Sequence, residues 1–189
     1  MVYYRIRSWL AGFRRQERGS VTVEAVITLP LLIWGIGATY EFFEVHRYKS
    51  TRDKAAYTIA DMISREMLPI TATYLNNAKT VFDTITNDEG NDSLRVSIVK
   101  YDVDEDEFSV KWSEVRGPTT LSKLTTEQVK DAHSLFPAMR DGEELVVVES
   151  LSPYPARFDV GLTDGMKVAT RVTTIPRFAP QINWDSGSS

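Results

Sequence analysis

The chain has 189 residues, enough for one domain with a core plus an appended segment, and its 42% hydrophobic and 25% charged residues are typical of a globular class. Residues 1–19 carry five arginines against one glutamate, so a net charge of −4 leaves −8 for the remaining 170 residues. A basic tip on an acidic body argues against nucleic acid as a partner, because the body repels phosphates. The absence of cysteine excludes disulfides, cysteine-ligated metals and thiol catalysis.

An apolar run follows the basic tip. Residues 25–40 (AVITLPLLIWGIGATY) contain no charge, and extending the run to 21–43 adds two acids, Glu24 and Glu41. At about 1.5 Å per residue, the longer stretch makes roughly 35 Å of helix, sufficient to span a bilayer. Pro30 lies inside the run and predicts a kink, because proline removes one backbone donor. Membrane helices tolerate such a residue when neighbouring groups satisfy the freed carbonyl.

Three interpretations of this run compete. A cleaved secretory signal has a basic start and a short apolar region, but it also needs a small-residue cleavage site after that region, and this chain continues into YEFFEVHRYKSTRDK. A buried core helix of a soluble protein leaves the five arginines unexplained. A single-pass anchor with its N-terminus in the cytoplasm explains both features, since arginines stay on the cytoplasmic side. The sequence favours the anchor.

The residues around the start of the run resemble a known family. Arg14, Arg15 and Arg18 precede the stretch GSVTVE at 19–24, and LPLL follows at 29–32. This pattern resembles the TadE/TadF-like minor pseudopilins, which belong to the tight-adherence (Tad) branch of bacterial type IV pilus systems. The acid-aromatic stretch YEFF at 40–43 is similar to the segment that commonly closes the family's apolar run. The resemblance covers residues 13–48.

The resemblance implies a processing event. Prepilin-type leaders are cut by a membrane aspartyl prepilin peptidase on the cytoplasmic face, directly after the glycine, which here is Gly19; Ser20 then becomes the new N-terminus. A glycine suits the position, because it lets an extended backbone approach a protease closely. The sequence departs from the family pattern at Ala25, where an aromatic residue is frequent, and in an unusually apolar leader (Tyr3, Tyr4, Trp9, Leu10 and Phe13).

Glu24 matches the family's acid. In a helix, residues 20 and 24 are i,i+4 neighbours on one face. After cleavage, Glu24 therefore has an ammonium partner at Ser20, on its own chain or on a neighbouring subunit, and such pairing sets the axial register between subunits because an unpaired charge in an apolar bundle is costly. The alternative is that Glu24 only lies at the headgroup level and has no such role.

Beyond the apolar run, the pattern stays helical and becomes amphipathic, so one helix is expected from about Ser20 to Met67. A second helix is predicted at 70–85, a loop at 86–92 and a hairpin of strands at 94–101 and 107–115. A short helix is predicted at 125–136 (TTEQVKDAHSLF), capped by Thr125 or Thr126. Further strands are predicted at 144–152 and 166–174, before a loose tail at 181–189. The fold class is α+β, in which the long helix, half in the membrane and half amphipathic, packs on a mostly antiparallel four-stranded sheet with short helices.

Few residues suggest chemistry. Asp102, Asp104 and Asp106 imitate the start of a calcium loop, but position six is Glu107 instead of glycine, so a solvated hairpin turn is the better interpretation. His46 and His133 join no catalytic or metal-ligand pattern. We therefore expect no cofactor, no metal and no enzymatic activity. A membrane-tethered enzyme is an alternative that needs a convergent polar site in the body.

The sequence predicts a structural and interaction protein. Its expected parts are a basic prepilin-type leader (1–19), the transmembrane half of the N-terminal helix (20–47) and an extracytoplasmic α+β domain (48–189). The expected location is the inner membrane, with the N-terminus cytoplasmic and the domain periplasmic; incorporation into the pilus is a further option. Expected partners are the inner membrane, a prepilin peptidase, other pseudopilins and pilus assembly platform proteins. The alternative is an uncleaved single-pass protein whose outer domain binds another envelope partner.

Overall fold

One continuous helix, α2 (Glu17–Ser64), begins the described part of the chain. The protein is represented by a computed structural model, which describes residues 17–118, 121–158, 161, 163 and 165–186. The helix was predicted to reach Met67, but it ends three residues earlier. A final turn closes it, in which the Arg65 N–H donates to the Met62 carbonyl at 3.3 Å, and Met67 beyond that turn is 74% exposed. Pro69 follows, and the residue before a proline disfavours helical geometry.

The chain forms two compact units, and α2 contributes to both of them. The first unit consists of residues 1–44 and 156–164, and the second of residues 45–155 and 165–189. The predicted division of the chain at residues 19 and 47 is not tested by this grouping. We describe each unit separately.

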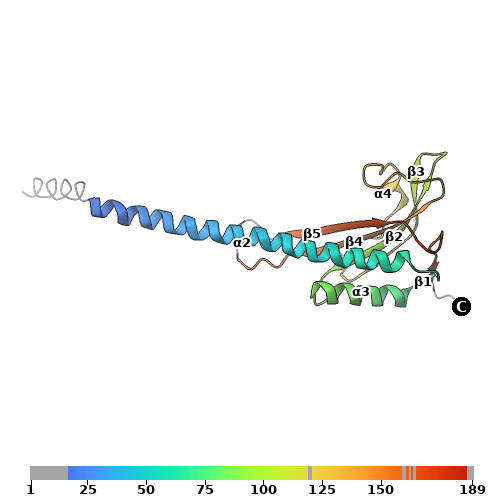
Figure 1. Ribbon diagram of the computed structural model, residues 1–189, viewed down its shortest axis with the longest axis horizontal. Helices are drawn as coiled ribbons and strands as arrows, with labels where there is room; N and C mark the ends of the chain where they lie inside the picture. The colour runs from blue at the N-terminus through green and yellow to red at the C-terminus, as the bar shows by residue number, and fades with distance from the viewer. Residues whose placement is uncertain (1–16, 119–120, 159–160, 162, 164, 187–189) are drawn as a thin grey trace, which may run out of the picture. The chain divides into compact units, whose positions relative to one another are not determined.

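The second unit is built on a four-stranded sheet of order β3-β2-β4-β5, in which every neighbouring pair is antiparallel (Figure 1). Its strands are β2 (Ser93–Asp102), β3 (Glu107–Arg116), β4 (Glu144–Pro153) and β5 (Lys167–Thr174). These bounds lie within one residue of the four predicted strands. Alternation of apolar and polar residues predicted β2 and β3. The α+β class with its largely antiparallel sheet is confirmed.

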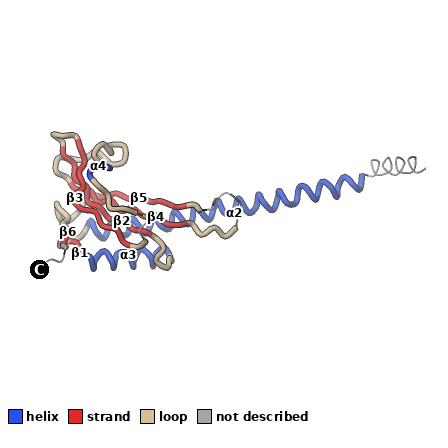
Figure 2. The backbone as a smooth tube through the Cα atoms, turned by 180° about the vertical axis from the view of Figure 1, so that it is seen from behind, coloured by secondary structure: helices blue, strands red, loops and turns tan. Residues whose placement is uncertain are grey.

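The main core lies between one face of the sheet and two helices. These are the Val45–Ser64 part of α2 and α3 (Ala72–Thr86), which lie side by side in both backbone views (Figures 1 and 2). The part of α2 in this core buries a narrow stripe of small and β-branched side chains, which lets the helix approach the sheet closely. The fully buried members of the core include Ala55, Ile59, Ile63, Ile70, Leu75, Phe82, Leu94, Ile98, Val146 and Val148.

The opposite face of the sheet is covered by the segment between β3 and β4. Its one helical turn, α4 (Thr126–Val129), begins after Thr125, as predicted, but stops much earlier than the predicted helix. Val129, Ala132 and Phe136 nevertheless form a second apolar cluster with the sheet residues Val99 and Val147. A buried ion pair lies on the same face, where Arg95 Nε donates to Glu149 Oε2 at 2.7 Å.

The C-terminal segment is ordered where the sequence predicted a loose tail. The two-residue strand β6 (Trp184–Asp185) pairs in parallel with β1 (Ile70–Thr71). Ile182 is 2% exposed, its N–H donates to Glu144 Oε2 at 2.8 Å, and its carbonyl accepts a bond from Trp112 Nε1 at 2.9 Å. The prediction of a loose tail is wrong for residues 182–185, because a buried isoleucine and two hydrogen bonds hold them; residues 187–189 lie outside the described part.

Candidate functional site

The apolar half of α2 exposes almost all of its large side chains. From Val21 to Ile36, the large apolar residues are each between 53% and 68% exposed. This is the one helix among the described residues that is long and apolar enough to cross a membrane, and none of its most apolar 18-residue window is buried within the structure. A core helix of a soluble protein buries such residues, so that alternative does not fit this unit. A signal sequence would meet the same criteria of length and composition.

The predicted processing site lies in the first turn of α2. Gly19 and Ser20 are helical in backbone, as is Arg18, whereas Arg14 and Arg15 lie outside the described residues. A peptidase that binds an extended substrate would have to unwind the helix around Gly19 and Ser20 to reach the bond between them.

Glu24 and Pro30 occupy the apolar half of the helix. Glu24 is exposed, one helical turn after Ser20, so the expected i,i+4 placement of these two positions agrees with the backbone. The pairing of the carboxylate with an N-terminal ammonium is a prediction about the cleaved chain. The helix continues through Pro30 without interruption, and the kink expected there stays a prediction.

Glu41, the second acid of the apolar run, has a contact that the sequence did not predict. It is 1% exposed, and its Oε1 accepts hydrogen bonds from the Arg157 and Phe158 N–H groups at 2.9 and 2.6 Å. These residues belong to the connection between β4 and β5, more than 100 positions further along the chain. An acid surrounded by aromatic residues was visible in the sequence, but nothing in the pattern identified its partner.

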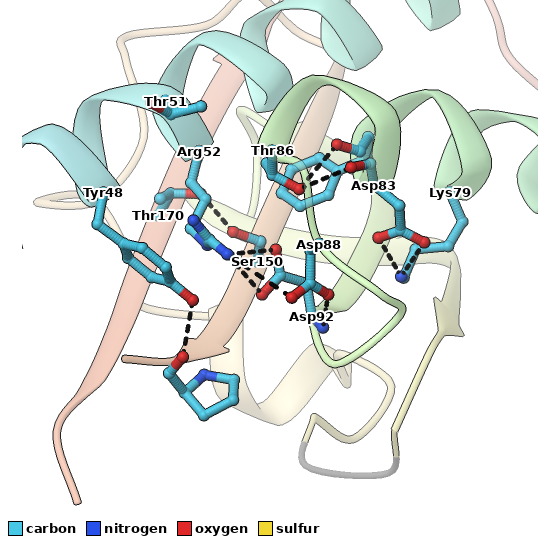
Figure 3. A network of polar contacts seen from close by, with 12 residues as sticks. Tyr48, Thr51, Arg52, Lys79, Asp83, Thr86, Asp88, Asp92, Ser150 and Thr170 are labelled. Carbon is cyan, nitrogen blue, oxygen red and sulfur yellow. Dashed lines mark hydrogen bonds and ion pairs between the residues drawn. The ribbon is translucent and has the colours of Figure 1, made fainter. Parts of the chain in front are cut away.

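A buried polar network connects the second part of α2 with the strands and with the loop before β2 (Figure 3). Arg52 points from α2 toward two aspartates, and its Nη2 lies 3.0 Å from Asp92 Oδ2 and 4.0 Å from Asp88 Oδ1. The side chains of Arg52 and Asp92 are 3% and 0% exposed. On the other side, the Arg52 guanidinium lies 3.2 Å from the centre of the Tyr48 ring, and Tyr48 Oη donates to the Pro153 carbonyl at 2.7 Å.

The electrostatics of this network follow from burial. Burial raises the pKa of Asp92 above its ordinary value, while Ser152 and Arg52 act in the opposite direction and a second carboxylate, Asp88, adds to the rise. Burial also raises the pKa of Tyr48 to about 12, although the neighbouring Arg52 charge opposes the shift. The Tyr48 phenol therefore stays neutral at physiological pH and remains a donor to Pro153. The network joins α2 to the ends of β2 and β4.

Replacing Tyr48 by phenylalanine tests this assignment. The variant keeps the ring under Arg52 but loses one hydrogen bond, so we expect the free energy of unfolding to fall by about 1 kcal/mol at neutral pH. The folded protein holds the phenol proton more tightly than the unfolded chain, so this group stabilises the fold below pH 10 and loses its contribution as pH rises through about 12. In urea unfolding of detergent-solubilised protein, the free energy of unfolding should fall less steeply between pH 10 and 12 in Tyr48→Phe than in the wild type. Tyr57→Phe, on the exposed side of the same helix, should behave like the wild type.

Three carboxylates near this network have the spacing of metal ligands, since oxygens of Asp83, Asp88 and Asp92 all lie within 4.8 Å of one another. Each of them already has a cationic neighbour. Lys79 Nζ donates to both oxygens of Asp83, at 2.5 and 2.6 Å, and Arg52 faces the other two residues. The charge of the cluster is thus largely compensated by side chains, and we assign no metal to it.

The aspartates that imitate a calcium loop form the β2–β3 turn, as predicted. Asp102 Oδ1 accepts bonds from the N–H groups of Asp104 and Glu105 at 3.0 and 3.3 Å, and Asp106 adopts a positive φ of 53°. His133 Nε2 lies 3.9 Å from Asp106 Oδ1, a proximity that the sequence did not predict.

His133 also borders an open pocket of about 250 Å³. Its lining is mostly apolar and aromatic, with His133 and the Tyr101 hydroxyl as its polar side-chain groups; the lining residues are Tyr101, Phe108, His133, Phe136, Pro137, Ala138 and Met139. Tyr101 already donates to Asp106. The pocket thus brings together an imidazole and a phenol, without a serine, threonine or lysine nucleophile among these residues.

Comparisons with models of protein families, with curated proteins and with solved structures gave no match to this chain. The resemblance to TadE/TadF-like pseudopilins consequently depends on residues 13–48, and its implications for function stay predictions.

Proposed function

We propose that this chain is a minor pseudopilin, a structural and assembly component of a Tad-type type IV pilus or secretion filament that is anchored in the inner membrane and cut after Gly19. One observation carries the proposal. A single helix, α2, joins an apolar half with exposed large side chains to a half whose narrow stripe is buried under an α+β domain. An apolar surface of this kind requires lipid or other apolar helices around it.

The two halves of α2 suit different tasks. Large exposed apolar residues on all sides of the first half provide a surface for a bilayer and, in a filament, for helices of other subunits. The second half cannot serve this purpose, because Ala55, Ile59 and Ile63 are already covered by the sheet. The body is acidic by sequence, and the arginines lie ahead of the apolar run, which gives the orientation proposed here.

Orientation is tested by protease protection. We expect protease added to intact spheroplasts to digest the domain that follows α2, because the arginines hold the N-terminus in the cytoplasm. Immunoblots against a C-terminal epitope should lose their signal before lysis. A cytoplasmic marker protein, protected until lysis, serves as the control. Full protection of the epitope in sealed spheroplasts, followed by digestion after lysis, would contradict the proposed topology.

Assembly is tested at Glu24. Glu24→Ala should leave membrane insertion and cleavage intact and ease insertion by about 2–3 kcal/mol if the site is deep, because a buried carboxylate is costly in lipid. Association with partner pseudopilins should nevertheless fall, because the N-terminal ammonium loses its partner. The measurement is co-purification with partner pseudopilins, together with rescue of pilus production in a deletion strain. Glu24→Asp, which keeps the charge, should retain part of the function, and full assembly by the alanine variant would mean that Glu24 only marks the headgroup level.

A second candidate is an uncleaved single-pass membrane protein whose outer domain binds another envelope partner. The exposed apolar half of α2 supports this candidate equally well, since it requires an anchor but no processing. The two candidates differ in the processing of the N-terminus and in the partner that the domain binds. The fate of the bond after Gly19 therefore decides between them.

A further inference from the structure

The first unit contains a loop that is fixed to the end of the apolar helix. The Arg157 and Phe158 N–H groups both donate to the same oxygen, Oε1, of Glu41. Hydrogen bonds to an ionised acceptor are roughly twice as strong as neutral ones, and two consecutive donors fix the direction of the backbone as well as its position. Because Glu41 is 1% exposed, water competes little for these bonds. The loop is thus held on α2 by a buried acid.

This attachment presents apolar side chains outward. The Phe158 ring is 53% exposed and packs edge-on against Tyr40, with 5.4 Å between the ring centres. Phe42 and Phe43 are 60% and 65% exposed, next to Glu41 in α2. Arg157, also exposed, adds a cation to this group. Three aromatic residues within one turn of α2 (Tyr40, Phe42 and Phe43) thus lie at the level where Phe158 and Arg157 are attached through their backbone N–H groups.

The chemistry of this group fits one kind of surface. Aromatic side chains and arginines collect where the hydrocarbon of a bilayer meets its headgroups, because rings enter the boundary while cations contact phosphates. The apolar run of α2 ends at Phe43, directly beside these rings, so the aromatic surface continues the surface that lipid is expected to cover.

We propose that the loop at residues 156–158 is a second membrane contact, in which Glu41 holds the backbone so that Phe158 enters the headgroup–acyl boundary of the membrane that α2 enters. This inference rests on the proposed function, since it requires α2 to be anchored in lipid. It adds a contact from the connection between β4 and β5 to the anchor that α2 supplies. Two segments of the chain then contact the bilayer, α2 and the loop at residues 156–158.

The absence of cysteine makes a direct test possible, because a single introduced thiol is the only labelling site. We would place a polarity-sensitive fluorophore at Phe158→Cys in full-length protein, reconstituted in vesicles of phosphatidylcholine and phosphatidylglycerol. Lipids brominated at shallow or at deep acyl positions then report depth. The proposal expects blue-shifted emission that shallow bromines quench more strongly than deep ones.

Two further probes separate this proposal from the proposed function. Ile33→Cys, 68% exposed in the middle of the apolar run, should be quenched by deep bromines if α2 is inserted. Val103→Cys, in the exposed β2–β3 turn, provides the emission expected in water, because Val103 is 49% exposed. A quenched probe at Ile33 with a water-like probe at Phe158 would overturn the second contact and leave the anchor in place. Water-like emission at both positions would overturn the membrane anchor itself.

Glu41→Gln tests the role of the acid. The variant keeps the side-chain size but replaces the charged acceptor by a neutral one, so most of the shallow quenching at position 158 should be lost while quenching at position 33 is unchanged. Glu89→Gln, an exposed glutamate in the loop before β2, is the matched control and should leave both signals unchanged. Unchanged quenching at 158 in Glu41→Gln would show that the acid does not hold the loop. Blue-shifted emission at 158 without bromine quenching would mean that protein covers Phe158, which contradicts a lipid contact.

Discussion

Arg52→Ala is expected to lower the free energy of unfolding of the domain by about 3–5 kcal/mol, because it leaves Asp92 as an unpaired charge in the interior. The Arg52 and Asp92 side chains are almost completely buried, and the distance between their charged atoms is 3.0 Å. The substitution also removes the guanidinium that stacks on Tyr48. Domains are stable by only about 5–15 kcal/mol, so a large part of the total is at risk.

Urea unfolding followed by circular dichroism measures this effect in detergent-solubilised protein. Arg65→Ala is the matched control, since Arg65, in the turn that closes α2, pairs with Asp61 at 3.0 Å but is 53% exposed. Exposed pairs of this kind contribute about 0–1 kcal/mol. Arg52→Lys, which keeps the charge, should lose less than Arg52→Ala. Equal small losses at positions 52 and 65 would show that the buried network contributes little to stability.

Gly19→Val is expected to abolish processing while leaving insertion into the membrane unchanged. The substitution places a branched side chain directly before the bond that the resemblance identifies as the cleavage site, where close approach of the backbone favours glycine. The apolar run from Val21 onward is untouched, so the anchor should still insert. Intact-mass measurement of membrane-extracted protein should find only the uncut chain.

Gly35→Val controls for the effect of adding a valine to α2. A side chain built at Gly35 meets no atom within 4 Å, so the helix accepts it without a clash. This variant should be processed like the wild type. Loss of processing in both variants would point to disturbed insertion, and normal processing of Gly19→Val would remove Gly19 from the cleavage site.

The regular elements were predictable from local patterns. Alternating apolar and polar residues predicted β2 and β3, the stretch after the Asp141–Gly142 turn predicted β4, and the uninterrupted helical pattern predicted α2. Gly117 and Pro118 marked the break after β3: Gly117 has a φ of +95°, and a Cβ there would lie 2.3 Å from the Asp92 carbonyl oxygen. The predicted helix after Thr125 was mostly wrong. It ends at Val129, and the later apolar residues Ala132 and Phe136 pack into the second apolar cluster from turns.

The long-range contacts were not predictable in the same way. Glu41 and Phe158, or Arg52 and Asp92, are brought together by the fold, and a single sequence carries no signal for such pairing. The parallel pairing of β1 with β6 involves two residues on each side, too few to give a pattern. Predictions about processing were limited for another reason. They concern a peptidase and neighbouring subunits, which act on residues 1–24 from outside the chain.

The mature N-terminus tests the central proposal most directly. The wild-type chain should be expressed in a host with a prepilin peptidase and in the same host without it, and the membrane-extracted protein analysed by intact-mass measurement and N-terminal sequencing. We expect a chain that begins at Ser20 in the first host and one that retains the leader in the second. An N-terminus at Met1 in both hosts would contradict this expectation and favour the uncleaved single-pass protein.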